Sequence, residues 1–199
     1  MIYKKMKKIL KLGNAMTGIN AQAKTAKAEM PTAPTVVRQN ILQGYIRQTQ
    51  EQTQWCWAAC AASVGNYYNE SKNYTQCYIA YTSLKTKYGS NTPNCCVTPA
   101  SCNTPWNFVD PLEAVNSYGS NQQGQIDFEI IQEQIDKGRP IGTCVEWSGG
   151  GAHFMMITGY NGNNITIQDP QEGQESIEYS SYTSKYGNSG KWTWTYFTK

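Results

Sequence analysis

Cys56 and Gln50 are the residues whose types and spacing first suggest chemistry, because Gln50 lies six positions before a cysteine that opens an apparent helix. The free N–H groups and the dipole at a helix N-terminus stabilise a thiolate. A glutamine amide beside that sulfur could donate to an oxyanion, together with the backbone N–H of Cys56. The pattern predicts a cysteine nucleophile with its oxyanion hole. Gln52 is the second choice for the side-chain donor.

A cysteine nucleophile needs one imidazole, and the chain contains a single histidine, His153. The imidazole takes the thiol proton and later protonates the leaving group. His153 follows three glycines at 149–151 and opens the apolar stretch 154–157. We therefore predict that His153 is the base. The alternative is that a lone histidine on an apolar strand is only a packed core residue.

Asp169 is the candidate that orients the imidazole by accepting its second N–H. It lies 16 residues after His153, beyond a turn sequence at 161–164 that predicts a hairpin. Because the two strands of a hairpin lie side by side, Asp169 is expected near His153. The alternative is that Asp169 and Pro170 only end a strand.

The elements that must position these residues change in type along the chain. Helical patterns come first and strand patterns follow, which is typical of an α+β fold with a mostly antiparallel sheet. We expect helices at about 53–65, 75–87, 106–118 and 127–137. We expect strands within 37–48 and at 140–147, 152–160, 165–170, 175–179 and 191–198.

Seven cysteines fit one nucleophile and three disulfides, which form in oxidising compartments. The loop at 89–104 is rich in cysteine, and Cys60 and Cys77 on the two preceding helices are its natural partners, although the sequence does not assign the pairing. Cys60 lies one helical turn after Cys56, roughly 6 Å away. We expect a structural disulfide at Cys60 rather than a redox pair with Cys56. One histidine and no paired C-x-x-C spacing argue against zinc, and no metal or cofactor is expected.

Charge divides the chain near residue 30. The first 30 residues hold seven of the 17 lysines and arginines and one of the 14 acids, so residues 31–199 carry a net charge of −3. This balance argues against a nucleic-acid partner. No apolar run approaches the ~18 residues that a membrane span needs. We expect a monomer whose domain covers 41–199, preceded at 1–40 by a basic leader that serves as signal, propeptide or linker. Its apolar region is interrupted by Lys11, so it matches a secretory signal poorly.

Several motifs in order resemble the papain-like cysteine proteases, in particular the compact bacterial branch that includes secreted effector proteases and is related to the leader-cleaving peptidase domains of bacteriocin exporters. They span about residues 43–198 and include Gln50…Cys56-Trp57-Ala58-Ala59, Gln76-Cys77, the cysteine-rich loop to Asn103, Ala152-His153-Phe154, Gln168-Asp169-Pro170 and the terminal segment from Tyr182 to Tyr196.

This resemblance implies a papain-like fold, with an N-terminal helical lobe that carries the nucleophile helix and a C-terminal antiparallel sheet lobe. It implies Cys56 as nucleophile, His153 as base, Asp169 as orienting group and Gln50 in the oxyanion hole. Trp57 stands where the exporter-linked peptidases usually have glycine, and no transporter domain follows in this sequence. Both features argue against the trimming of double-glycine leaders.

The expected function is that of a bacterial papain-like endopeptidase, secreted or periplasmic, that acts on a protein or peptide. Two alternatives stay open. The same triad could serve acyl transfer, as in a protein deamidase or a transglutaminase-like enzyme. The chain could also be a catalytically silent, disulfide-rich toxin or binding module.

Overall fold

The computed structural model describes residues 37–185 and 190–199, so nearly all of the leader predicted at 1–40 lies outside the described residues. Among the described residues, no helix is long and apolar enough to cross a membrane.

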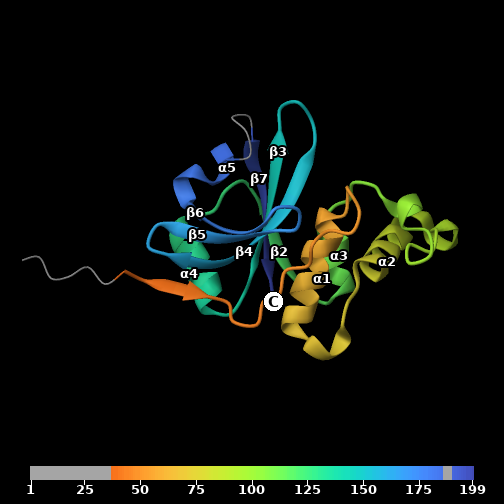
Figure 1. Cartoon of the computed structure of the whole chain (residues 1–199), viewed down its shortest axis with the longest axis horizontal. Coiled ribbons are helices and arrows are strands. Elements are labelled where there is room, and N and C mark those ends of the chain that lie inside the picture. The colour runs from red at the N-terminus through yellow and green to blue at the C-terminus, as the bar shows by residue number, and fades with distance from the viewer. Residues whose placement is uncertain (1–36, 186–189) are drawn as a thin grey trace, which may run out of the picture. The chain divides into compact units, whose positions relative to one another are not determined.

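The first half of the described chain forms a helical lobe. Helices α1 (Cys56–Tyr68), α2 (Gln76–Tyr88) and α3 (Val109–Ala114) gather beside the sheet (Figure 1). Thr75 caps α2, since its hydroxyl accepts the backbone N–H of Tyr78. Short 3-10 turns connect these helices at Glu70–Lys72, Gly89–Asn91 and Pro99–Cys102. The helices predicted at 53–65 and 75–87 are confirmed.

The second half forms an antiparallel sheet in the order β2-β7-β3-β4-β5-β6, and β1 adds to β4. Its strands are β1 (Gln39–Ile41), β2 (Tyr118–Gln123), β3 (Ile141–Trp147), β4 (Ala152–Asn161), β5 (Asn164–Asp169), β6 (Gly173–Glu178) and β7 (Gly190–Thr198). Helix α4 (Phe128–Asp136), the 3-10 turn Tyr179–Ser181 and the short α5 (Tyr182–Lys185) belong to the same lobe. The predicted α+β class is confirmed.

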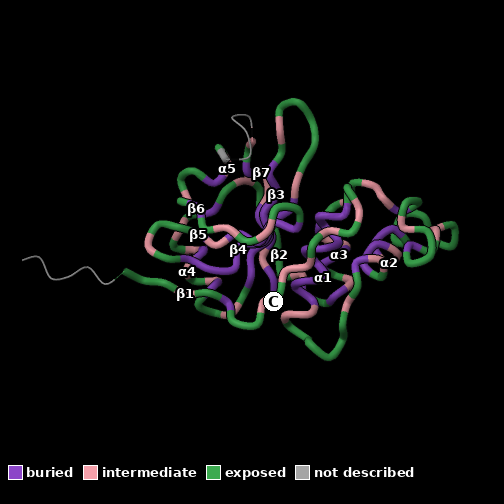
Figure 2. The backbone as a smooth tube through the Cα atoms, viewed as in Figure 1, coloured by how far each residue is buried: buried purple, intermediate pink, exposed green. Residues whose placement is uncertain are grey.

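Two apolar cores lie on the two faces of the central strands. Along β4, Phe154 and Met156 join the core beneath α1, whereas Met155 and Ile157 join the core that includes Ile131 of α4. Successive side chains of a strand point to opposite faces, so an uninterrupted apolar run is what a strand covered on both faces requires. Figure 2 shows β4 buried along its middle. The strand that carries His153 is therefore among the most enclosed elements.

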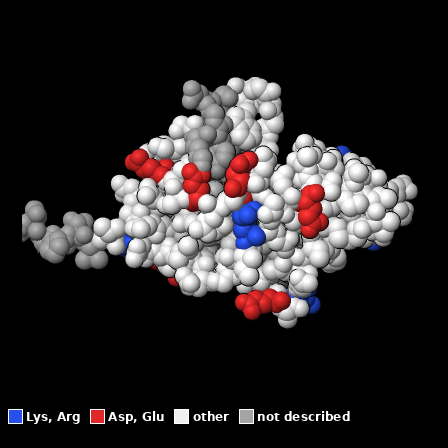
Figure 3. Space-filling model, in the orientation of Figure 1, with Lys and Arg blue, Asp and Glu red and all other residues white. Residues whose placement is uncertain are grey.

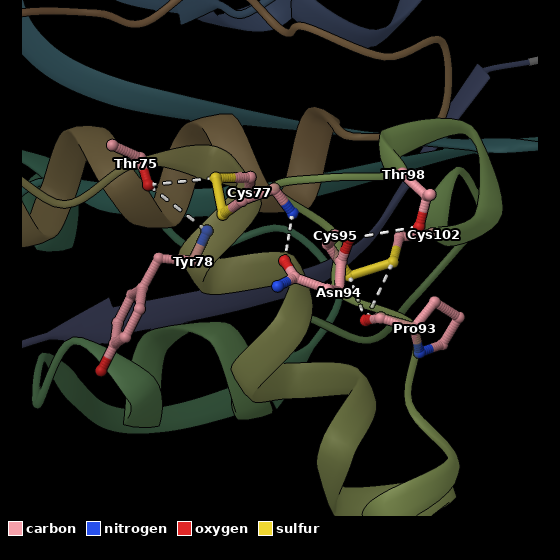
Figure 4. The surroundings of a disulfide bond; sticks show 9 residues. Thr75, Cys77, Tyr78, Pro93, Asn94, Cys95, Thr98 and Cys102 are labelled. Carbon is pink, nitrogen blue, oxygen red and sulfur yellow. Dashed lines mark hydrogen bonds between the residues drawn. A yellow bond between two sulfur atoms is a disulfide. The ribbon is translucent and has the colours of Figure 1, made fainter.

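The cysteine pairing differs from the prediction. Two disulfides form, Cys77–Cys96 and Cys95–Cys102, and Cys56, Cys60 and Cys144 are free and buried. The loop is therefore tied once to α2 and once to itself (Figure 4). The expected third disulfide and the linked Cys60 are both wrong.

Cys60 is free because of where it points on α1. Its thiol faces the sheet and donates to the carbonyl of Phe154 over 3.4 Å. Packing between α1 and β4 thus keeps it away from the cysteines of the loop.

The third predicted helix, at 106–118, is confirmed only over Val109–Ala114. Helix α3 ends at Ala114, Asn116 takes a positive φ of 56°, and Tyr118–Gln123 is strand β2. Gly119 is not a helix stop but a strand residue, and a Cβ on it would lie 2.9 Å from the carbonyl oxygen of Phe197. β2 is an exposed edge strand without apolar alternation, so pairing with β7 decides its structure.

Candidate active site

Cys56 is the first residue of α1, and no side chain caps this end of the helix. The backbone N–H groups of the first turn therefore have no acceptor within the helix, and they lie at the same helix end as the Cys56 side chain. Two indoles fix the helix start to the disulfide loop: Trp55 Nε1 donates to the carbonyl of Cys102 over 2.9 Å, and Trp57 Nε1 to that of Thr104 over 3.1 Å. The loop thus helps to position the cysteine.

His153 and Asp169 are brought together by the β4–β5 hairpin. His153 Nε2 lies 2.7 Å from Asp169 Oδ1, and the same oxygen accepts the backbone N–H groups of Gln171 and Glu172. Cys56 acts on the same imidazole through hydrogen bonding and charge that raise its pKa, and Nδ1 is the ring nitrogen that Asp169 leaves for the sulfur. The three predicted residues therefore form one continuous chain of contacts.

The charges of this chain of contacts reinforce one another. Burial lowers the pKa of His153, but hydrogen bonds and charge from Asp169 and Cys56 outweigh it and raise the pKa to about 9. Burial raises the pKa of Asp169, but its bonds to His153 and to two backbone N–H groups bring the net value below the usual one. The pair is thus an imidazolium and a carboxylate at neutral pH. An imidazolium beside a cysteine is the general arrangement that activates a thiol.

Gln50 lies beside this group but is engaged elsewhere. Its backbone N–H donates to Pro170, just after Asp169, over 2.9 Å. Its side-chain Nε2 donates to the carbonyls of Gln52 and Thr53, both over 3.1 Å, and its Oε1 is buried without a hydrogen-bond partner. In this structure the amide braces the turn before α1. The alternative donor, Gln52, contributes its backbone carbonyl to the same turn.

An open cleft of about 880 Å³ reaches the sulfur from outside. Both lobes line it, and its residues are Thr53, Gln54, Cys56, Trp57, Pro105, Trp106, Glu146, Trp147, Gly150, Gly151, Ala152, His153, Phe154, Asp169, Gln171 and Glu172. Gly150 and Gly151 have positive φ angles of 91° and 95°, so the turn that leads into His153 requires glycine. No group of three or more His, Cys, Asp or Glu is placed to hold a metal ion in the described ranges 37–185 and 190–199.

Comparison with known families gives the chain its classification. Residues 42–199 match the model of the Peptidase_C39 like family. The chain belongs to this family. The predicted resemblance to papain-like cysteine proteases is thereby confirmed, and with it a cysteine peptidase at the level of the family. No curated protein matches the sequence.

Two solved structures share the fold of this C39-like chain. A C39-like peptidase from Bacillus anthracis is 11% identical with a TM-score of 0.50, and the match covers 81% of this chain and 98% of that one. The peptidase domain of Streptococcus ComA, a bi-functional ABC transporter involved in a quorum-sensing pathway, is 17% identical with a TM-score of 0.50, covering 77% and 98%. At these identities the likeness shows the fold alone.

Sequence reasoning missed most of the cleft wall of this C39-like peptidase. Trp106 follows the cysteine loop and stays half-buried, and Glu146 interrupts the otherwise buried strand β3. A charged residue within an apolar strand is the signal that could have found Glu146, since such a residue must face solvent, a partner or a ligand. Trp106 had no comparable signal, because tryptophans also pack in cores.

Proposed function

We propose that this chain is an endopeptidase that cleaves peptide bonds of a protein or peptide with Cys56 as nucleophile, His153 as base and Asp169 as orienting group. The observation that carries the proposal is the grouping of the Asp169 carboxylate, bonded to His153, with Cys56, whose hydrogen bonding and charge raise the His153 pKa, at an uncapped helix end that opens into a cleft. Cys56 also lies outside both disulfides, which argues against a silent binding module.

In the proposed reaction, the Cys56 thiolate attacks the carbonyl carbon of the scissile bond, and the carbonyl oxygen becomes an oxyanion. The His153 imidazolium gives its proton to the leaving amine as the C–N bond breaks, and a thioester remains. His153 then takes a proton from water, whose oxygen attacks the thioester. The C–S bond breaks, the acid product leaves, and the thiolate returns.

The oxyanion hole follows from the helix start. The backbone N–H of Cys56 is the first donor, because the first turn of α1 leaves it without a helical acceptor. Gln50 is the proposed second donor. For this role its Nε2 has to exchange one of its two backbone carbonyls for the oxyanion when substrate binds.

The two disulfides support a secreted or periplasmic location, since disulfides persist in oxidising compartments. We further propose that the peptidase domain is residues 41–199 and that residues 1–40 are a leader, with a propeptide role tested by comparing the activity of full-length and trimmed chains. Equal activity of the two forms would argue against inhibition by this segment.

Substitution of Cys56 tests the catalytic proposal. Cys56→Ala should lower cleavage of an unfolded protein such as casein by at least about 10⁴-fold, while circular dichroism and the melting temperature stay close to those of the wild type. Cys60→Ala is the matched control, since it removes another buried thiol from the same helix and should keep cleavage.

Alkylation of the Cys56 thiol is an independent test of the same proposal. Iodoacetamide should label Cys56 in the folded wild type, and His153→Ala should slow that labelling. Full casein cleavage by Cys56→Ala would end the proposal. Ammonia release without chain cleavage would instead identify a protein deamidase that uses the same thioester.

A further inference from the structure

Apart from the His153 imidazolium, the charged side chains that line the cleft are acidic. None of its lining residues is a lysine or arginine, whereas Glu146, Glu172 and Asp169 are acidic. Asp169 is bound to His153, and Glu172 accepts a hydrogen bond from Gln171 Nε2 over 3.0 Å. Acidic side chains also predominate over basic ones on the face drawn in Figure 3. Glu146 is therefore the cleft carboxylate with the fewest bonds to its own chain.

Glu146 lies on the cleft side of β3. It pairs with Ala152 of β4, which also lines the cleft. Cys144, two residues before Glu146 on the same strand, lies in the core beneath α1. Burial is the main cause that raises the pKa of Cys144 to about 12, and the charge of Glu146 adds to it. Lys191 stands opposite Glu146 on β7 but does not line the cleft, and no ion pair within 4.0 Å joins the two side chains in the described part of the chain.

Aromatic side chains line the same cleft as this carboxylate. Trp57 and Trp106 line the cleft from the helical lobe, and Phe154 lines it from β4. Trp106 is held in place, because its Nε1 donates to Asp110 Oδ2 over 3.0 Å. The cleft thus offers apolar walls and a negative charge within the same space.

This combination fits a long cationic side chain. Lysine and arginine bury their methylene stems along apolar surface and keep the charged head on a polar partner. An apolar side chain in the same place would cover Glu146 and leave its charge without a partner, which is unfavourable. An acidic side chain would be repelled. Glu146 therefore discriminates against both.

We propose that Glu146 makes the cleft selective for substrates that carry a lysine or arginine side chain close to the scissile bond. The proposal rests on the proposed function and names its substrate class. Trp57, Trp106 and Phe154 hold the stem of that side chain, and Glu146 binds its head.

The test separates the preference from the chemistry by using two readouts. Cleavage is measured on internally quenched peptides that place Lys, Arg, Gln, Leu or Glu in turn at each position around the scissile bond. Binding of the same peptides is measured on the full-length Cys56→Ala variant, where hydrolysis does not intervene. At one position, both kcat/KM and affinity should be about tenfold higher for Lys and Arg than for Leu and Gln, which corresponds to roughly 1.4 kcal/mol.

Substitutions assign the preference to a residue. Glu146→Gln should remove it, and Glu146→Lys should reverse it in favour of Glu. Glu129→Gln, at an exposed site on α4 with the same loss of charge, should leave it unchanged. A preference that survives Glu146→Gln, one that only Glu172→Gln removes, or equal binding of all peptides would overturn the inference. If no peptide is cleaved, the proposed function fails, while the binding result still decides the inference.

Discussion

The helical lobe and the sheet lobe are held together in different ways. The sheet lobe buries apolar side chains on both faces of β4 and pairs its strands in one antiparallel sheet. The helical lobe contains the loop between α2 and α3, in which Cys95, Cys102 and Phe108 are buried but most other residues are not. Both disulfides lie there, and none lies in the sheet lobe among the described residues. The disulfides lie where little apolar surface is buried. A disulfide stabilises the fold mainly by lowering the conformational entropy of the unfolded chain, so it does not depend on burial.

The same difference divides the candidate site. The sheet lobe supplies His153 and Asp169 from two paired strands, whereas the helical lobe supplies Cys56 from a helix start that two indoles tie to the loop. The base and its orienting group are thus built into one rigid hairpin. The nucleophile stands on α1, whose buried residues belong to the core beneath it, and two indoles join this helix to the disulfide-linked loop.

Apart from loss of the Cys56 thiol itself, the largest effect is expected in the sheet lobe. Asp169→Asn keeps the shape of the side chain but removes the charge that orients and stabilises the imidazolium, so kcat should fall by about 10²- to 10⁴-fold. The alkaline limb of the pH profile of kcat/KM, expected near the His153 pKa of about 9, should move to lower pH. An unchanged pH profile would show that Asp169 serves only to end β5.

The second effect concerns the helical side of the site. Gln50→Ala removes the proposed second oxyanion donor and should lower kcat by about 10²- to 10³-fold with little change in KM. Gln52→Ala is the control, since Gln52 contributes only its backbone carbonyl to the turn. If Gln50→Ala mainly lowers the melting temperature and spares kcat, the amide only braces the turn before α1.

The third prediction tests whether the two lobes differ in stability when a disulfide is removed. The Cys77–Cys96 disulfide closes a sequence separation of 19 residues, so Cys77→Ser with Cys96→Ser should lower the free energy of unfolding by about 3 kcal/mol. Amide hydrogen exchange should quicken in α2 and the adjoining loop before it does in β3–β5. Cys144→Ala, which removes a free thiol of the sheet lobe, should not produce that pattern. Equal loss of protection in both lobes would contradict the division.

The smallest effect is the pH dependence of stability. The pKa of His153 is about 9 in the folded chain, above the ordinary value of about 6.5, so the protonated imidazole stabilises the fold. This contribution is complete below about pH 6.5 and is lost as the pH rises through 9. Urea unfolding at pH 6, 7 and 8 should show a falling free energy of unfolding, with a slope of at most about 1.4 kcal/mol per pH unit.

His153→Gln should flatten that slope. The range stops at pH 8 because Cys60 and Cys144, whose pKa values burial raises, add a loss of their own near pH 8.5 and above. A slope that persists in His153→Gln would trace the pH dependence to other groups.

Sequence reasoning reached the two elements with strong local signals. The apolar run after His153 and the turn before Asn164 predict a hairpin, and the turn sets the register of β4 on β5 as far as Gly159 and Thr166. A bulge between Ile157 and Gly159 then shifts the register on the side of the hairpin that carries His153 and Asp169. Helix α4 shows clear spacing of Ile131 and Ile135 and is confirmed. Strand β2 carried no such signal, since its exposed polar residues become a strand only by pairing with β7.

The sequence by itself determined the family, the α+β class, and the residue types and order of the candidate triad. Only the tertiary structure decided that Cys60 is free, that the loop is tied to α2 and to itself, and that Gln50 Nε2 is bound to two carbonyls. It also decided that Glu146 faces the cleft. The physical reason is the sequence separation of the residues that interact. Hairpins and helices follow from residues close together in the chain, whereas disulfide pairing, amide orientation and cleft walls depend on which distant segments pack together.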